Sequence, residues 1–207
     1  MNLPNLPASW QAPRLDGRHV ALEPLAVEHA EGLSLALKGD ELSRLWYTNV
    51  PKAADVEAWV GTALDKQRQG LETPFVVRDA DGLVVGSTRF YDMDASVPKL
   101  SIGYTWYAPR VQRSGLNTEA KLLLLTHAFE TLQCASVYLE TSWFNHASRT
   151  AIARLGAKQD GILRNHRRHA DGTMRDTVVF SIIDREWPAV KSNLSCRLEQ
   201  GGRKHGQ

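Results

Sequence analysis

The sequence predicts a mixed α/β (α+β) domain in which a central sheet carries helices on both faces. Two observations predict it. Segments of alternating apolar and polar residues, typical of strands, occur together with segments whose apolar residues are three and four positions apart, typical of helices. Along the chain the order is strand, two helices, three strands, helix, strand, helix and two strands. Consecutive strands followed by strand–helix units favour a mixed sheet covered on both sides.

The first part of the chain contains one strand and two helices. Residues 19–25 alternate like a strand, and helices are predicted at 26–39 and 54–69. Each helix has one apolar stripe, which we expect to face the sheet. The stripes consist of Ala26, Ala30, Leu33 and Leu37 in the first helix and of Val56, Trp59, Val60 and Ala63 in the second.

The middle of the chain is predicted to be a meander of three strands. Residues 73–78 and 83–91 are joined by a tight turn, and 99–107 is the third strand. Because side chains alternate along a strand, Leu100, Ile102, Tyr104 and Trp106 are expected on one face. The remaining elements are a helix at 118–132, a strand at 136–141, a helix at 145–155, a hairpin at 157–183 and a last helix that begins near 184.

The composition indicates a folded domain and argues against several functional classes. Of the 207 residues, 43% are hydrophobic, which is enough for a core. The formal net charge of +2 gives no indication of nucleic-acid binding. The start of the chain lacks the pattern of a signal peptide, and no apolar stretch approaches the roughly 18 residues of a membrane span. We expect a soluble, cytoplasmic protein without a nucleic-acid or membrane partner.

The domain boundaries follow from proline, glycine and charge at the ends. Residues 1–13 contain three prolines and are predicted to be an N-terminal arm, and residues 14–190 form the domain. Residues 191–207 are predicted to be a C-terminal tail that is partly disordered, from Gly201 onward. Cys134 and Cys196 are distant and have no CxxC partner, so we expect reduced thiols and no metal.

The sharpest chemical signal is a strand–loop–helix segment at 102–120. The first turn of a helix presents unpaired N–H groups and a partial positive charge, which suits a pyrophosphate. Gly115 allows the backbone to approach an anion closely or to take positive φ, and Gln112, Arg113 and Ser114 can add donors. By itself the loop is ambiguous, because many such joints bind nothing. It is neither a Walker loop nor a dinucleotide-binding fingerprint.

A second signal lies at 140–157, where a strand ends and a polar helix start follows. Asn145 can cap that helix, which is its structural interpretation. Ser148 lies one turn further on the same side. Without other context, Ser148 is interpreted as a capping or surface serine.

Together the two segments resemble the GNAT acetyltransferases, and most closely the branch of the RimL and RimJ ribosomal-protein N-terminal acetyltransferases. The family loop Q/R-x-x-G-x-G/A is similar to Gln112-Arg113-Ser114-Gly115-Leu116-Asn117, with asparagine where the family usually has glycine or alanine. The family's Asn-x-x-Ser is similar to Asn145-His146-Ala147-Ser148. Its hairpin sequence resembles Asp160-Gly161-Ile162-Leu163-Arg164, and the order of elements agrees over about 14–190.

The resemblance implies the GNAT fold, with a mostly antiparallel sheet of about seven strands and a V-shaped splay between strands 99–107 and 136–141. Acetyl-CoA, the co-substrate, would lie in the splay with its pyrophosphate on the loop 112–118, and its pantetheine would pair with a strand end. The residues implied in its binding are Trp106, Tyr107, Gln112, Arg113, Ser114, Gly115, Leu116, Asn117, Thr118, Asn145 and Ser148.

The resemblance also implies direct attack of a neutral amine on the thioester, without a metal or a covalent enzyme intermediate. A backbone N–H freed by a bulge would polarise the carbonyl. Ser148 would protonate the departing thiolate, and Asn145 would hold the pantetheine or a bridging water. The general base is left open between Glu140, Glu23 and His146.

The acceptor site is expected to depend on the first third of the chain. Trp46 and Tyr47 are interpreted either as an aromatic wall of the acceptor pocket or as a core staple between two helices, and Glu140 is assigned to acceptor binding. The basic cluster 164–169 is interpreted as a solvated hairpin tip.

Three questions about function stay open at this point. The acceptor is a protein N-terminus or a small molecule such as an amino acid, polyamine or antibiotic. A non-catalytic acyl-CoA sensor is the alternative of another class. An exposed strand edge or hairpin would also allow a homodimer.

Overall fold

The computed structural model describes residues 10–39 and 42–203 and confirms the mixed α/β class. One sheet has the strand order β1-β2-β3-β4-β5-β6-β8-β7. Every neighbouring pair is antiparallel except β5 and β6, which are parallel. The sheet has eight strands instead of about seven, because a short β1 precedes the strands that the periodicity predicted.

The strands are β1 (Leu15–Asp16), β2 (Val20–Pro24), β3 (Glu72–Asp79), β4 (Val84–Asp94), β5 (Lys99–Tyr107), β6 (Ser136–Ser142), β7 (Lys158–Arg168) and β8 (Met174–Ile183). The helices are α1 (Ala30–Ala36), α2 (Val56–Arg68), α3 (Leu116–Thr126), α4 (His146–Leu155) and α5 (Trp187–Arg203). A π-helical turn, η6 (His127–Thr131), continues α3. The predicted elements are therefore present, with ends that differ by a few residues.

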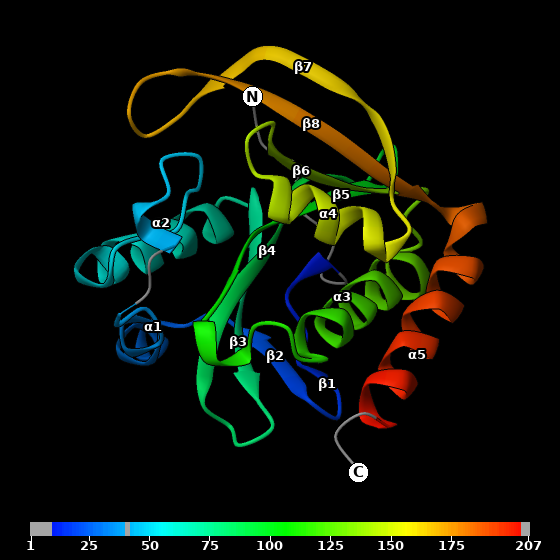
Figure 1. Ribbon diagram of the computed structural model, residues 1–207, viewed down its shortest axis with the longest axis horizontal. Helices are drawn as coiled ribbons and strands as arrows, with labels where there is room; N and C mark the ends of the chain where they lie inside the picture. The colour runs from blue at the N-terminus through cyan, green and yellow to red at the C-terminus, as the bar shows by residue number, and fades with distance from the viewer. Residues whose placement is uncertain (1–9, 40–41, 204–207) are drawn as a thin grey trace.

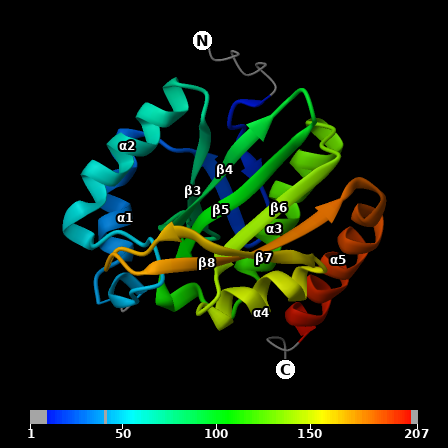
Figure 2. The same ribbon diagram turned by 90° about the horizontal axis from the view of Figure 1, so that it is seen from above.

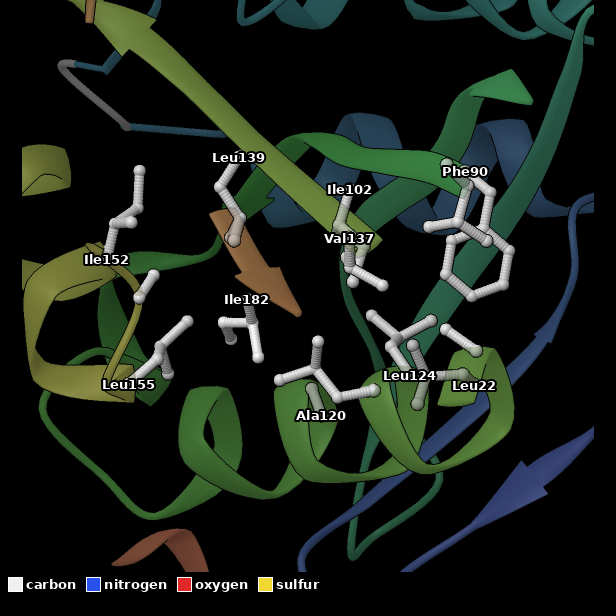
Figure 3. Close-up of a cluster of buried hydrophobic side chains, with 14 of the residues drawn as sticks. Leu22, Phe90, Ile102, Ala120, Leu124, Val137, Leu139, Ile152, Leu155 and Ile182 are labelled. Carbon is white, nitrogen blue, oxygen red and sulfur yellow. The ribbon is translucent and has the colours of Figure 1, made fainter. Parts of the chain in front are cut away.

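The helices divide between the two faces of the sheet, as Figures 1 and 2 show. The larger hydrophobic cluster joins α3, α4 and α5 to one face, and Figure 3 shows Ala120 and Leu124 of α3 lying against Ile102, Val137 and Ile182 of the strands. The smaller cluster lies under α1 and α2 on the other face. The helix stripes predicted from the sequence supply it, including Leu33, Val56, Val60 and Ala63.

A β-bulge in β5 overturns one predicted face. Tyr104 and Thr105 together oppose the single residue Thr88 of β4, and Tyr104 has a φ of 52°. An extra residue shifts the alternation of all later side chains. Ile102 therefore packs in the larger cluster, whereas Trp106 packs in the cluster under α1 and α2. The prediction that these side chains share one face was wrong.

The sheet opens between β5 and β6. The two strands pair only at Lys99–Ser101 with Ser136–Tyr138, although β5 continues to Tyr107 and β6 to Ser142. On its other edge β6 pairs with β8 along its whole length. The facing edges of β5 and β6 therefore lack a strand partner beyond the third residue pair, which is the predicted splay.

The packed region extends beyond the predicted domain limits at both ends. Trp10, assigned to the arm, is buried in the larger cluster, and its carbonyl accepts a hydrogen bond from Thr73 Oγ1 at 3.0 Å. At the other end α5 continues through 191–203, which the sequence assigned to a tail, and its Leu194 is fully buried. Residues 1–9 of the predicted arm and the last four residues of the chain lie outside the described residues.

Candidate active site

A cavity of about 400 Å³ occupies the opening between β5 and β6. Side chains from α3 and α4, including Asn117 and Ser148, line it on one face of the sheet. On the opposite face it is lined by the segment 47–50 that connects α1 and α2, by Tyr91 of β4 and by Arg175 of β8. The cavity therefore passes through the sheet, and two molecules can approach its middle from opposite sides.

The loop before α3 is folded by its own polar side chains. Ser114 Oγ donates to the carbonyl of Val111 at 2.7 Å and accepts from the N–H of Leu116 at 3.2 Å. Gln112 Nε2 donates to the carbonyl of Tyr107 at 3.1 Å, and Arg113 has a φ of 61°. The left-handed residue of the loop is thus Arg113.

Gly115 differs from its prediction. It is the N-cap of α3 with a φ of −66°, so its backbone does not need the freedom of glycine. A Cβ atom there would lie 3.6 Å from His19 Cδ2 and Leu198 Cδ2, which is ordinary contact. Of the two roles predicted for Gly115, positive φ is therefore wrong. The close approach of an anion to this turn stays a prediction.

The loop residues divide between the cavity and the frame. Gln112, Arg113 and Asn117 line the cavity. Leu116 is buried in the larger hydrophobic cluster, so it anchors α3. Within the described ranges, the N–H groups of Asn117 and Thr118 in the first turn have no acceptor. They retain the donor capacity expected at a helix start.

Glu119, in that same first turn, was missed by the sequence analysis. Its buried carboxylate accepts hydrogen bonds from the backbone N–H groups of Arg18 and His19, the first at 2.8 Å. These bonds tie the start of α3 to the turn between β1 and β2. An acidic residue in a helix's first turn is usual, so its sequence position carried no sign of this long-range contact.

The second motif lies beside the opening. Asn145 Oδ1 accepts the N–H of Ser148 at 3.0 Å and so caps α4, as its structural interpretation predicted. The side chains of Asn145 and Ser148 both line the cavity. The Ser148 hydroxyl makes no hydrogen bond to any described residue. It is therefore available to a group in the cavity.

The two aromatic residues between α1 and α2 have different positions. Tyr47 lines the cavity, whereas Trp46 does not. The Trp46 ring is 42% exposed and contacts Phe144 and His169, with ring centroids 5.1 and 4.7 Å away. Trp46 therefore connects the α1–α2 segment to the β7–β8 hairpin outside the cavity, and it is not a core staple between the helices.

Of the three candidate bases, only Glu140 lines the cavity. Its Oε2 accepts a hydrogen bond from Arg167 Nη2 at 3.1 Å. Glu23 instead contacts Arg78 at 2.8 Å and also contacts Arg14, and it is absent from the lining. His146 is exposed at the start of α4 and is also absent from the lining.

Lys121 was missed by the sequence analysis, although it is the one lysine or arginine in the predicted helix 118–132. It is 5% exposed, lines the cavity, and donates from Nζ to Thr105 Oγ1 at 2.8 Å. Burial lowers the pKa of Lys121 to about 7. Near neutral pH a substantial fraction of this amine is therefore uncharged.

The strand β5 also borders the opening and contains a bulge. The bulge at Tyr104 and Thr105 interrupts pairing with β4, and residues 103–107 line the cavity. Tyr107 is buried there, and burial raises the pKa of its phenol. The predicted bulge therefore exists beside the opening, one to two residues before Trp106.

The described residues contain no group of three or more histidine, cysteine, aspartate or glutamate side chains placed to hold a metal ion. Within the same ranges, no helix is both long enough and apolar enough to cross a membrane.

Comparisons with known proteins agree with this geometry. Residues 19–158 match the acetyltransferase (GNAT) domain family. YdaF of Bacillus subtilis, which is named as a candidate ribosomal N-acetyltransferase, is 27% identical over 180 residues, covering 84% of this chain and 96% of YdaF.

Two solved structures are also similar. A candidate acetyltransferase from T. thermophilus is 34% identical with a TM-score of 0.80, and the match covers 91% of this chain and 99% of that one. A GCN5-related N-acetyltransferase from Brucella melitensis is 30% identical with a TM-score of 0.81, and the match covers 90% and 85%. Together with the split sheet and the two motifs, these matches show that the chain belongs to the GNAT acetyltransferase family and is an acetyltransferase enzyme.

Proposed function

We propose that the protein transfers an acetyl group from acetyl-CoA to a primary amine by direct attack in a ternary complex. The observation that carries this proposal is the cavity that passes through the sheet between β5 and β6. It has the two motif segments on one side and a separate set of polar side chains on the other. Such a passage lets a donor and an acceptor meet without sharing an entrance, and held reactants gain roughly 7–11 kcal/mol through placement.

GNAT acetyltransferases use acetyl-CoA, and the proposal assigns its parts to the first side of the cavity. The N–H groups of Asn117 and Thr118 and the side chains of Gln112 and Arg113 would bind the pyrophosphate. The pantetheine would lie between the unpaired edges of β5 and β6 like an added strand. Its thioester would then reach the bulge at Tyr104.

The reaction follows from this placement. The amine nitrogen attacks the thioester carbonyl carbon, an N–C bond forms, and the C–S bond breaks. A backbone N–H at the bulge stabilises the oxyanion. The departing thiolate takes a proton from the Ser148 hydroxyl, which regains one from solvent, and Asn145 caps the start of α4, where Ser148 lies. Glu140, which lines the cavity, accepts the proton that the amine loses and releases it to solvent.

The direct test measures free thiol released from acetyl-CoA in the presence of amines, with the protein treated with EDTA. Thiol release that depends on the amine is the expected result. Calorimetry with CoA should show metal-independent binding. Absence of both heat and thermal stabilisation would contradict the proposal. Tight CoA binding with no thiol release for any amine would instead indicate the acyl-CoA sensor.

Both acceptor classes belong in this test. The name of YdaF supports including peptides with varied first residues, as models of protein N-termini. Free amino acids and polyamines represent the small-molecule class. Acetylation of peptides alone would favour a protein substrate, and acetylation of amino acids or polyamines alone would favour the small-molecule alternative.

A further inference from the structure

Arg175 is a buried cation that has no carboxylate partner among the described residues. It lies on β8, is 8% exposed and lines the cavity. Its Nε is buried and makes no hydrogen bond, and the side chain forms no ion pair within 4 Å with any residue in the described ranges. A guanidinium carries five donors and stays charged, so a protein rarely buries one without an acceptor.

Two other arginines differ from Arg175, because each of them lies beside a carboxylate. Arg89 is also buried, but its Nη1 lies 2.6 Å from Glu72 Oε2. Arg167, on the neighbouring β7, lies 3.1 Å from Glu140 Oε2. Each of these cations therefore has a carboxylate, whereas Arg175 has an opening in front of it.

The charges around Arg175 define what the opening can accept. The charged neighbours that affect it are Arg167 and Glu140, while Tyr91 and Tyr104 are the nearby phenols. Burial, and then the positive charge of Arg167, lower the pKa of Arg175. The negative charge of Glu140 balances the positive charge of Arg167. The positive charge of Arg175 is therefore left without a counter-charge among the described residues. A single negative charge would balance it.

The strand pairings place this cation on the acceptor side. Glu140 pairs with Val179 across β6 and β8, so Glu140, Val179, Thr177 and Arg175 point to one face. Val178 packs in the larger cluster with α3 and therefore points to the other face. Arg175 is thus on the face opposite the loop 112–118, away from the place proposed for the pyrophosphate.

We propose that the amine acceptor carries a carboxylate close to its primary amine, and that Arg175 binds this carboxylate. The inference rests on the proposed function and narrows its substrate class. A guanidinium matches a carboxylate through two parallel hydrogen bonds, which would orient the acceptor as well as hold it. The carboxylate comes either from the α-carboxylate of a free amino acid or from an acidic side chain at a peptide N-terminus.

The experiment compares acceptors that differ only at the carboxylate. One arm uses free amino acids against their amides, and the other uses tripeptide amides that begin with Asp or Glu against those that begin with Asn or Gln. We expect kcat/KM for the acid to exceed that for its amide by about 10²-fold in one arm, because a charged hydrogen-bonding pair is lost in the amide. The arm that shows the preference identifies the source of the carboxylate.

Variants connect the preference to the residue. Arg175→Gln should abolish most of the preference for the acid and leave KM for acetyl-CoA unchanged, and Arg175→Lys should retain part of it. Arg164→Gln is the matched control, because Arg164 lies on the same hairpin, is largely exposed and contacts Asp176. Loss of CoA binding would show that Arg175→Gln does not fold. In that case the role of Arg175 is tested with Arg175→Lys, and the carboxylate preference is tested with the acid–amide comparison on the wild type.

Two outcomes would overturn the inference. Equal rates for acids and amides in both arms would leave the proposed acetyl transfer standing and remove the carboxylate site. A preference that survives unchanged in Arg175→Gln would assign the recognition to another residue. Failure of every amine to release thiol would instead contradict the proposed function itself.

Discussion

The two ends of the cavity are built in different ways. The end at α3 and α4 consists of two short continuous segments, 112–118 and 145–148, each with a helix start. The acceptor end gathers single residues from distant elements, among them Tyr47, Glu140 and Arg175. The first end presents mainly backbone N–H groups at helix starts to the cavity. The second end presents side chains that the sheet brings together.

This difference suits the two ends to different ligands, acetyl-CoA at one end and the acceptor at the other. Backbone N–H groups at a helix start suit a part common to all acetyl-CoA molecules, since they do not change with sequence. Side chains on separate strands can vary one at a time, which suits an acceptor that differs between family members. Changes at the α3–α4 end should therefore affect acetyl-CoA, and changes at the acceptor end should affect acceptor choice.

The largest expected effect concerns Lys121, which lies on α3 and donates to Thr105 at the bulge of β5. Its pKa is lowered from 10.5 to about 7, so between these values the unfolded chain binds a proton that the folded protein does not. Wild-type stability contributed by this group therefore rises as pH increases from about 7 to 10.5. Lys121→Met should be more stable than wild type below pH 7, by on the order of 2–4 kcal/mol.

The advantage of Lys121→Met should shrink as pH rises towards 10.5. Thermal unfolding of both proteins from pH 6 to pH 10 measures it. Lys38→Met is the control, because Lys38 is exposed. A stability difference that does not change with pH would show that Lys121 is not buried as a destabilised cation.

The next effect tests whether the α3–α4 end also takes part in chemistry. Ser148→Ala should lower kcat by about 10²-fold or less, with KM for acetyl-CoA little changed, because the thiolate forms only late in the reaction. Steady-state kinetics with an accepted amine measures both constants. Thr150→Ala, on the exposed side of α4, is the control. An unchanged kcat would show that Ser148 is a structural serine at the start of α4 and does not protonate the thiolate.

A smaller effect concerns the frame of the α3–α4 end. In Glu119→Gln one amide NH₂ must face a backbone N–H of Arg18 or His19, so one buried donor loses its acceptor. We expect a loss of about 1–2 kcal/mol in the free energy of unfolding. Denaturant unfolding measures it, with the exposed Glu31→Gln as control. A preserved midpoint would mean that the turn can rearrange at no cost.

The smallest effect is expected at the helix start itself. Gly115→Val should weaken CoA binding by about fivefold, because the side chain would interfere with an anion at this turn, while the αR backbone accepts valine without left-handed strain. Calorimetry measures the affinity, and Gly61→Val on α2 serves as control, because a Cβ atom there has no neighbouring atom within 4 Å. Wild-type affinity in Gly115→Val would place the phosphate contacts elsewhere on the loop.

The sequence by itself determined the element order and the α3–α4 end. Periodic apolar residues such as those of α2 report directly on the face that a helix buries. The segments 112–118 and 145–148 could be identified from the sequence because each consists of residues that are neighbours along the chain.

Only the tertiary structure decided the acceptor end and the exact faces of β5. The bulge at Tyr104 and Thr105 depends on pairing with β4, and it moved Trp106 to the face opposite Ile102. The unpaired state of Arg175 among the described residues is likewise invisible in sequence, since it depends on which carboxylates lie within reach in space. The physical reason is the same in both cases, because burial, register and charge pairing are set by contacts between residues far apart in the chain.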